Sequence, residues 1–471
     1  MSRPATLGQL RESPWRSVPV KEEVRRNAAV RIAAGRPIVE GVVGYDDTVL
    51  PQLENALLAG HDTIFLGERG QAKTRIIRSL TELLDEWLPV VAGSEINDDP
   101  YNPVSLHARD LVRDHGDDTP VEWIHRSTRF GEKLATPDTS IADLIGEVDP
   151  IKVAEGRYLS DELTLHYGLV PRTNRGIFAI NELPDLSERI QVGLLNVLEE
   201  RDIQVRGYKI RLPLDLMLVA SANPEDYTNR GRIITPLKDR FGAQIRTHYP
   251  LDTDLELAVV RQEAHTLDAT AVGVPGLRVE VPDHMAEIVA TISHEARRNP
   301  HVNQRSGVSV RLTIANYETM VANAARRALR LGETVVVPRI SDLDALPAST
   351  AGKIEIETLD EGDDGSVLDR IVKTSVLEVF RKRCPIETLR QAIDGFDGGT
   401  IVHTGDDVPS AAYVTALSTL PALRKVVVPL AGSEHPAALA SAVELVLEGL
   451  HLSRRLNKDA SGGRATYRGR G

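Results

Sequence analysis

The feature that most constrains this chain is a glycine-containing loop between a short apolar run and an amphipathic stretch. Residues 63–66 (TIFL) lead into GERGQAKT at 67–74, and residues 75–87 repeat apolar side chains at helical spacing. A strand, a loop and a helix in this order suit a phosphate group, because the loop amides and the first helical turn present several donors. Lys73 then reaches the outer phosphates, and the Thr74 hydroxyl is a ligand for Mg²⁺. The general pattern has a glycine directly before the lysine, where this chain has Ala72.

Two further strand patterns end in polar residues. The run GIFAI at 176–180 leads to Asn181 and Glu182, and the run at 214–221 leads to Asn223. Hydrolysis of a phosphoanhydride needs a residue that helps hold Mg²⁺ and a carboxylate that orients the attacking water. Glu182 suits the second role, whereas the first falls to Asn181, an uncharged residue where an aspartate is usual. Asn223 could position the same water; the alternatives are a buried strand with a polar end and a turn-initiating Asn-Pro pair.

The hydrophobic pattern predicts an α/β protein of several parts. From residue 38 to about 250, apolar runs at 63–66, 176–180, 214–221 and 244–248 alternate with helical stretches, as in a parallel sheet covered by helices. After residue 250 the stretches 252–265, 284–298 and 312–331 are amphipathic and predict a helical lid. We therefore expect an N-terminal helical segment (1–38), a nucleotide-binding core (39–250), a helical lid (251–335), an acidic linker (336–367), a C-terminal helical region (368–452) and a disordered basic tail (453–471).

Composition narrows the function classes. The chain has 56 Lys+Arg against 68 Asp+Glu, and the resulting net charge of −12 disfavours nonspecific attraction to nucleic acid or anionic lipid. Its single cysteine, Cys384, cannot form an intrachain disulfide. No run approaches the roughly 20 apolar residues of a membrane helix. These observations predict a soluble, cytoplasmic protein that binds no membrane.

Taken in order, the motifs resemble those of AAA+ ATPases, in the branch of the MoxR proteins and the ATPase subunit of magnesium chelatase. The similarity runs from about residue 42 to 331 through GVVGYDDTVLPQLENALLAG, LGERGQAKT, RGIFAINELPDL, VASANPEDY, TPLKDRFG and SGVSVR. This resemblance implies an AAA+ P-loop NTPase core, with a five-stranded parallel sheet and helices on both faces, followed by a helical lid and a C-terminal helical region.

The resemblance also implies residue roles. Arg240 matches the arginine finger that acts on the neighbouring subunit's nucleotide, and Arg311 matches sensor 2; each is otherwise an ordinary surface arginine, Arg240 as an ion-pair partner of Asp239. The remaining matches are Walker A at Gly67, Glu68, Arg69, Gly70, Gln71, Ala72, Lys73 and Thr74, Walker B at Asn181 and Glu182, sensor 1 at Asn223, the adenine neighbours Val43 and Tyr45, and the Mg²⁺ ligands Thr74 and Asn181.

Two inserted stretches resemble this branch as well. Residues 145–175 occupy the place of its helix-2 insert, and residues 202–212 alternate like a hairpin. In the family such hairpins face the ring pore or the client. A surface loop and an edge hairpin are the alternatives for this chain.

These matches predict an ATP-binding and ATP-hydrolysing ring, a hexamer, that uses ATP and Mg²⁺ and drives metal insertion or protein remodelling. The chain lacks the Asp-x-Ser-x-Ser sequence of a von Willebrand factor A domain, so a separate partner with that domain is expected. Two alternatives stay open. One is a nucleotide-dependent switch or scaffold with little hydrolysis, because Asn181 is neutral. The other is a nucleic-acid-directed AAA+ protein, which the acidic balance and the lack of a GAFTGA-type loop disfavour.

Overall fold

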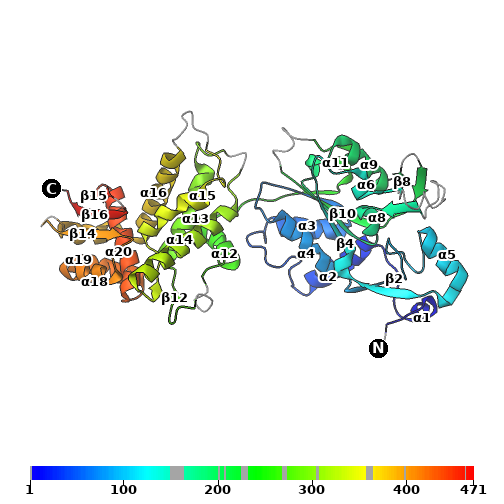
Figure 1. Cartoon of the computed structure of the whole chain (residues 1–471), viewed down its shortest axis with the longest axis horizontal. Helices are drawn as coiled ribbons and strands as arrows, with labels where there is room; N and C mark the ends of the chain where they lie inside the picture. The colour runs from blue at the N-terminus through cyan, green and yellow to red at the C-terminus, as the bar shows by residue number, and fades with distance from the viewer. Residues whose placement is uncertain are drawn as a thin grey trace. The chain divides into compact units, whose positions relative to one another are not determined.

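The chain folds into two compact units, Met1–His248 and Tyr249–Gly471, shown in a computed structural model (Figure 1). The structure describes residues 3–148, 164–199, 202–205, 208–223, 232–267, 273–303, 307–356, 364–396, 399–461 and 463–470. Among the helices of these residues, none combines the length and the apolar character that crossing a bilayer requires.

The first unit alternates strands and helices along its whole length. Its elements are α1 (Leu7–Glu12), α2 (Val20–Ala33), α3 (Val49–Ala59), β1 (Thr63–Leu66), α4 (Lys73–Ser79), η1 (Leu80–Leu83), β2 (Trp87–Val91), α5 (Leu106–His115), η2 (Gly116–Asp118), β3 (Val121–His125), η3 (Arg126–Arg129), β4 (Phe130–Leu134), α6 (Ile141–Leu144), β5 (Gly146–Val148), β6 (Leu165–Tyr167), α8 (Leu169–Arg172), β7 (Gly176–Asn181), η5 (Leu183–Asp185), α9 (Glu188–Glu199), β8 (Asp202–Val205), β9 (Tyr208–Arg211), β10 (Leu216–Ala222), α11 (Thr235–Arg240) and β11 (Ala243–Arg246).

A five-stranded sheet with the order β11-β1-β10-β7-β4 forms the centre of this unit, and all its neighbouring strands are parallel. The predicted parallel sheet is therefore confirmed. Its strands bury both faces: Ile64, Phe178 and Leu218 pack on one side, and Phe65 and Ile177 on the other. Four of the five strands were predicted from the sequence: the inner strands β1, β10 and β7 are continuous apolar runs, and β11 at one edge has the sequence AQIR. The fifth, β4, lies at the sheet edge and has the polar sequence FGEKL.

The helical segment before the core belongs to the first unit. Val20, Val24 and Ala28 of α2 pack in the same cluster as the sheet. The buried carboxylate of Glu23 forms a two-pronged ion pair with the fully buried Arg129, at 2.7 Å and 2.6 Å. The predicted boundary at residue 38 therefore does not separate two structural parts, because α2 completes one face of the core.

Both inserted stretches contain paired strands. β8 and β9 form the antiparallel hairpin that the alternating pattern of residues 202–212 predicts. β5 and β6 pair in the other insert, antiparallel as well. Residues 149–163 of that insert lie outside the described part of the chain.

The second unit is mainly helical. Its elements are α12 (Thr253–Glu263), β12 (Arg278–Val279), α13 (Asp283–Arg298), α14 (Val310–Leu331), β13 (Val335–Val336), η6 (Ile340–Ala345), α15 (Leu346–Thr350), α16 (Asp364–Arg383), η7 (Ile386–Leu389), α17 (Arg390–Asp394), β14 (Ile401–Gly405), α18 (Ser410–Thr419), α19 (Pro421–Ala431), α20 (Pro436–Leu452), β15 (Leu456–Ser461) and β16 (Arg464–Gly469). The three predicted lid helices correspond to α12, α13 and α14 within one or two residues.

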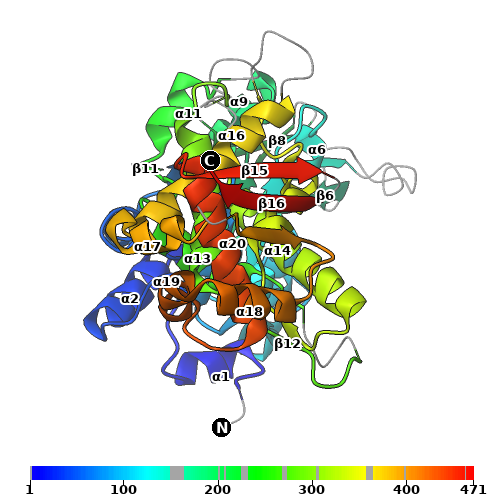
Figure 2. The ribbon, with the colours of Figure 1, turned by 90° about the vertical axis from the view of Figure 1, so that its left-hand side faces the viewer.

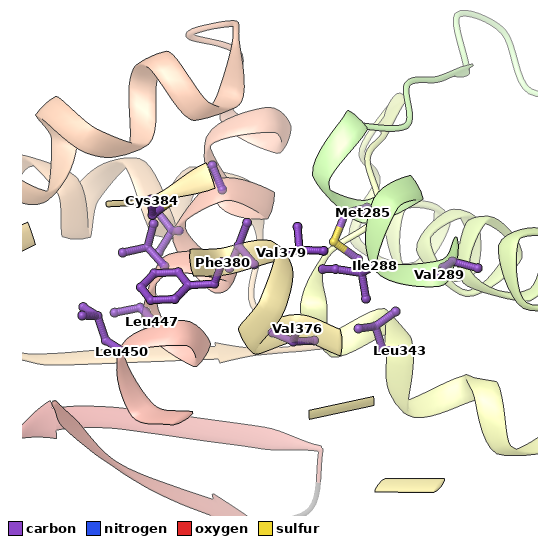
Figure 3. Packing of buried hydrophobic residues seen from close by; sticks show 14 of the residues in the cluster. Met285, Ile288, Val289, Leu343, Val376, Val379, Phe380, Cys384, Leu447 and Leu450 are labelled. Atoms are coloured by element: carbon purple, nitrogen blue, oxygen red, sulfur yellow. The ribbon is translucent and has the colours of Figure 1, made fainter. Parts of the chain in front are cut away.

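One continuous core joins the parts that the sequence pattern separates into lid, linker and C-terminal region. Met285 of α13, Leu343 of η6, Phe380 of α16 and Leu447 of α20 belong to the same buried cluster (Figure 3). Helices α16 and α20 approach closely because Gly449 has no side chain: a Cβ there would lie 2.1 Å from the Phe380 ring. The expected solvated linker is thus wrong for residues 340–350, which fold as η6 and α15. Residues 357–363 of that linker are outside the described part.

The expected disordered tail is also wrong. β15 and β16 form an antiparallel sheet with β14 and lie beside α20 (Figure 2). Tyr467 is buried, and its hydroxyl bonds to Glu448 of α20. Carboxylates balance the basic side chains of the tail: Lys458 pairs with Glu448 at 2.7 Å, and Arg464 pairs with Asp407. The excess of positive charge therefore reflects long-range pairing rather than a solvated segment.

The Glu23–Arg129 pair makes a stability prediction. Arg129→Met leaves the buried Glu23 carboxylate without its cation, so we expect the free energy of unfolding to fall by about 3–5 kcal/mol. Urea denaturation followed by tryptophan fluorescence reports on the first unit alone, because Trp15, Trp87 and Trp123 all lie there. The control Arg26→Met breaks the exposed pair with Asp85 and should cost under about 1 kcal/mol. Equal losses in the two variants would contradict the buried pair's importance.

A second prediction concerns the loss of folding stability at low pH. Burial, and then the nearby Arg383, lower the pKa of His284 to about 4, and its Nε2 lies 3.0 Å from Ser441 Oγ. Since the unfolded histidine takes up its proton at higher pH than the folded one, stability is lost as pH falls from about 6.5 toward 4. The loss should approach about 3 kcal/mol. The melting temperature is measured by calorimetry at several pH values. It should fall less with acid in His284→Asn than in the native chain, whereas the control variant His403→Asn, at an exposed site, should behave like the native chain.

Candidate functional site

The loop after β1 adopts a conformation that few side chains tolerate. A Cβ at Gly67 would lie 2.0 Å from Thr247 Oγ1, so only glycine fits between β1 and the chain after β11. Gly70 has φ 76°, and Ala72, directly before α4, has φ 55°. The departure from the general glycine pattern therefore falls on a left-handed position, where an alanine costs about 1–2 kcal/mol of strain.

Lys73 begins α4 and folds back into this loop. Its side chain is 6% exposed, and Nζ donates to the carbonyl oxygens of Gly67 and, at 2.8 Å, Glu68. It also donates to Oδ1 of Asn223 at 2.9 Å. The structure thus joins two predicted site residues that are 150 positions apart in sequence. An ammonium group held by three oxygens here can exchange them for phosphate oxygens.

The end of β7 forms a second polar cluster. Asn181 Nδ2 donates to Glu132 Oε1 at 2.6 Å, and its Oδ1 accepts from Ser221 Oγ at 3.2 Å. The same Ser221 oxygen accepts the backbone N–H of Glu182 at 3.3 Å. Glu182 itself has φ 55°, a left-handed conformation that a non-glycine residue keeps only where the surroundings enforce it. Hydrogen bonds through Ser221 therefore link β7 to the strand that carries Asn223.

Ser221 and Glu132 are site neighbours that sequence reasoning missed. Ser221 is a lone hydroxyl near the end of an apolar strand, and Glu132 is an acid inside the polar edge strand β4. Their positions in the sequence give no direct signal, because only the register of β10, β7 and β4 brings them together.

Tyr45 fastens the backbone of the phosphate loop. The side chain is 4% exposed, and its hydroxyl lies 2.9 Å from the Gln71 carbonyl and 2.8 Å from the His248 carbonyl. Burial raises the pKa of Tyr45 to about 12, so the hydroxyl stays a donor at neutral pH. Val43 is half-buried in the same segment. That these two residues border adenine stays a prediction; the contact with Gln71 gives Tyr45 a structural role in addition.

A cavity of about 320 Å³ lies beside the loop. Three loop residues of the predicted site, Gly67, Glu68 and Gln71, line it. Five further residues, which sequence reasoning did not assign to the site, complete the lining: Leu66, Lys238, Gln244, Arg246 and Thr247. The side chain of Gln71 is fixed by Thr247, whose Oγ1 donates to Gln71 Oε1 at 2.7 Å. Two basic side chains at this cavity favour an anionic occupant.

The two predicted arginines are on the surface. Arg240 is the last residue of α11 and is exposed. Arg311 is exposed in the first turn of α14, and its backbone N–H donates to Ser309 at 3.2 Å. Arg311 belongs to the second unit and Arg240 to the first, so their roles as sensor 2 and arginine finger stay predictions.

The comparisons with known proteins agree with this architecture. A family model described as the Sigma-54 interaction domain, an AAA+ domain, matches residues 154–240, which include the ends of β7 and β10 and Arg240. Over residues 154–240 the chain is therefore similar to an AAA+ domain. The five-stranded parallel sheet and its helices are consistent with an AAA+ P-loop NTPase core. A search of curated proteins found no match.

Three solved structures are similar to this chain. A magnesium chelatase BchI–BchD complex is 22% identical over 68% of this chain and 97% of that chain, with a TM-score of 0.35. A candidate ATPase from Cytophaga hutchinsonii is 15% identical over 75% and 96%, with a TM-score of 0.30. NtrX from Brucella abortus in complex with ATP is 15% identical over 83% and 72%, with a TM-score of 0.39. TM-scores this low carry no argument about what this chain does.

The contacts of Lys73 predict the effect of its removal. Lys73→Met deletes a charged donor worth about 1.5–3 kcal/mol to a phosphate, so ATP affinity should fall by about ten- to a hundredfold. Titration with a fluorescent ATP analogue measures this change. The matched control Lys133→Met lies on β4 of the same sheet and should bind normally. Unchanged affinity in Lys73→Met would place the nucleotide elsewhere.

Proposed function

We propose that this AAA+ chain binds ATP with Mg²⁺ at residues 67–74 and hydrolyses it as the motor subunit of a homo-oligomeric ring. One observation carries the proposal: the ends of β1, β7 and β10 bring Lys73, Asn223 and the Asn181–Glu182 pair to one edge of a parallel sheet. Lys73 touches Asn223, and Ser221 ties β10 to the backbone of Glu182.

The chemistry follows from these positions. Lys73 exchanges its carbonyl partners for the outer phosphate oxygens, and the loop N–H groups hold the inner ones. Asn223, already beside Lys73, is placed to contact the γ-phosphate, while Glu182 orients the attacking water. The oxygens of Thr74 and Asn181 fit a hard cation, which prefers oxygen ligands. Bound Mg²⁺ would neutralise charge on the phosphoryl oxygens during transfer.

The ring and its partner are further parts of the proposal. Arg240 is exposed at the end of α11, as a residue acting on a neighbouring subunit's nucleotide must be. A hexamer in the cytoplasm, working with a separate von Willebrand factor A partner, fits the resemblance to the MoxR and magnesium chelatase branch. Metal insertion and protein remodelling are both compatible with this proposal.

A second candidate is a nucleotide-dependent switch that hydrolyses ATP slowly. The observation in its favour is Asn181, a neutral amide at the position where a carboxylate is usual. Weaker electrostatics around the metal would slow turnover more than binding.

Glu182→Gln separates the two candidates. If the chain is a motor, this variant should lose about 10²–10⁴-fold in turnover, because the amide no longer polarises water, while ATP affinity stays within about threefold. Turnover is measured as phosphate release, and the exposed Glu188→Gln on α9 is the matched control. Equal, negligible rates in the native chain and Glu182→Gln would reject the motor and leave the switch.

A further inference from the structure

The carboxylate nearest to Asn181 comes from the edge strand of the sheet. Glu132 of β4 accepts a hydrogen bond from Asn181 Nδ2 at 2.6 Å. We infer that Glu132 supplies, one strand away, the negative charge that Asn181 lacks at the Mg²⁺–ATP site. This inference rests on the proposed nucleotide site and adds to it a metal-supporting residue.

The sheet geometry holds the two side chains on one face. Glu132 is the direct partner of Ala179, and Asn181 follows Ala179 by two residues, so both point to the same side. A diagonal pair of this kind is within reach of long side chains. Asn181 is 8% exposed, so the contact is sheltered from water.

The pair is chemically matched. Because a carboxylate only accepts, Asn181 must turn its NH₂ group to Glu132 and its oxygen to Ser221, as the structure has it. An aspartate at 181 would place a second carboxylate within hydrogen-bond distance of the first, and two such charges cannot both stay ionised cheaply. A neutral residue at 181 and an acid at 132 therefore leave one carboxylate in this pair.

Helix α4 places this carboxylate near the metal-binding face of the loop. Glu132 Oε2 accepts from Arg78 Nε at 2.7 Å, and Arg78 lies four residues after Thr74, on the same face of α4. The bonds to Asn181 and Arg78 occupy one lone pair on each oxygen. The others can accept hydrogen bonds from metal-bound water. Arg78 and Glu132 form an ion pair, and because the Arg78 side chain is 64% exposed, water screens its compensation of the Glu132 charge.

The test measures how much Mg²⁺ strengthens ATP binding. ATP affinity is titrated with Mg²⁺ and with EDTA for the native chain, Glu132→Gln, Asn181→Asp and the double variant. The gain is the ratio of ATP affinity with Mg²⁺ to ATP affinity in EDTA. Glu132→Gln should reduce this gain by about 10–100-fold and leave ATP affinity in EDTA unchanged. The double variant, which moves the charge back to 181, should restore the gain to within about threefold of the native value. Without Mg²⁺, the single variant Asn181→Asp should melt at a lower temperature than the native chain.

Controls separate charge from structure. Glu132→Asp keeps the charge and should keep most of the gain, and tryptophan fluorescence shows whether each variant is folded. Glu82→Gln removes the exposed partner of Arg126 and should behave as native. The inference would be overturned if Glu132→Gln kept the native Mg²⁺-dependent gain in ATP affinity, or if the folded double variant did not recover it. Either result would leave the proposed function standing. A native chain that binds no ATP would overturn both.

Discussion

The parallel pairing of β1, β10 and β7 is the constraint on which the rest of the site depends. Leu66 is opposite Ala222, so the loop that starts at Gly67 begins beside Asn223. A slip of one residue would turn Asn223 to the other face and remove it from Lys73. Burial of both faces forbids that slip, because each strand would move its apolar side chains out of the clusters they fill. The hydrophobic core thereby sets the geometry of a polar site.

The same burial decides what the sequence reveals of the fold. The strands β1, β7 and β10 are largely apolar and bounded by polar or turn residues, so the sequence pattern predicts them. Both edge strands contain polar residues, Gln244 and Arg246 in β11 and Glu132 and Lys133 in β4, and only β11 was predicted. In the second unit helices were predictable, but their packing was not. Its helices were predictable one by one, but their common core depends on contacts such as Phe380 with Gly449, which no local pattern contains.

The residues of the site also divide into those that local sequence reveals and those that it does not. Asn223, directly after β10, and Lys73, at the start of the helix that follows β1, are found from local sequence, and the structure brings them into contact. Their supports come from elsewhere in the chain: Thr247 fixes Gln71, and Ser221 joins Asn181 to Glu182. The register of the strands, rather than spacing along the sequence, brings Thr247 and Ser221 to the site. Residues that would act between subunits or between the two units depend on an arrangement that neither local sequence nor one unit contains.

The two departures from the general pattern differ in kind. Ala72 carries its strain in φ, in a loop that is held by Gly67, Tyr45 and Gln71. Such strain lowers stability. Asn181 instead removes a negative charge at the proposed metal site, and its amide donates a hydrogen bond to the carboxylate of Glu132. An amide at 181 is therefore compatible with an active site as long as the neighbouring strand retains its carboxylate.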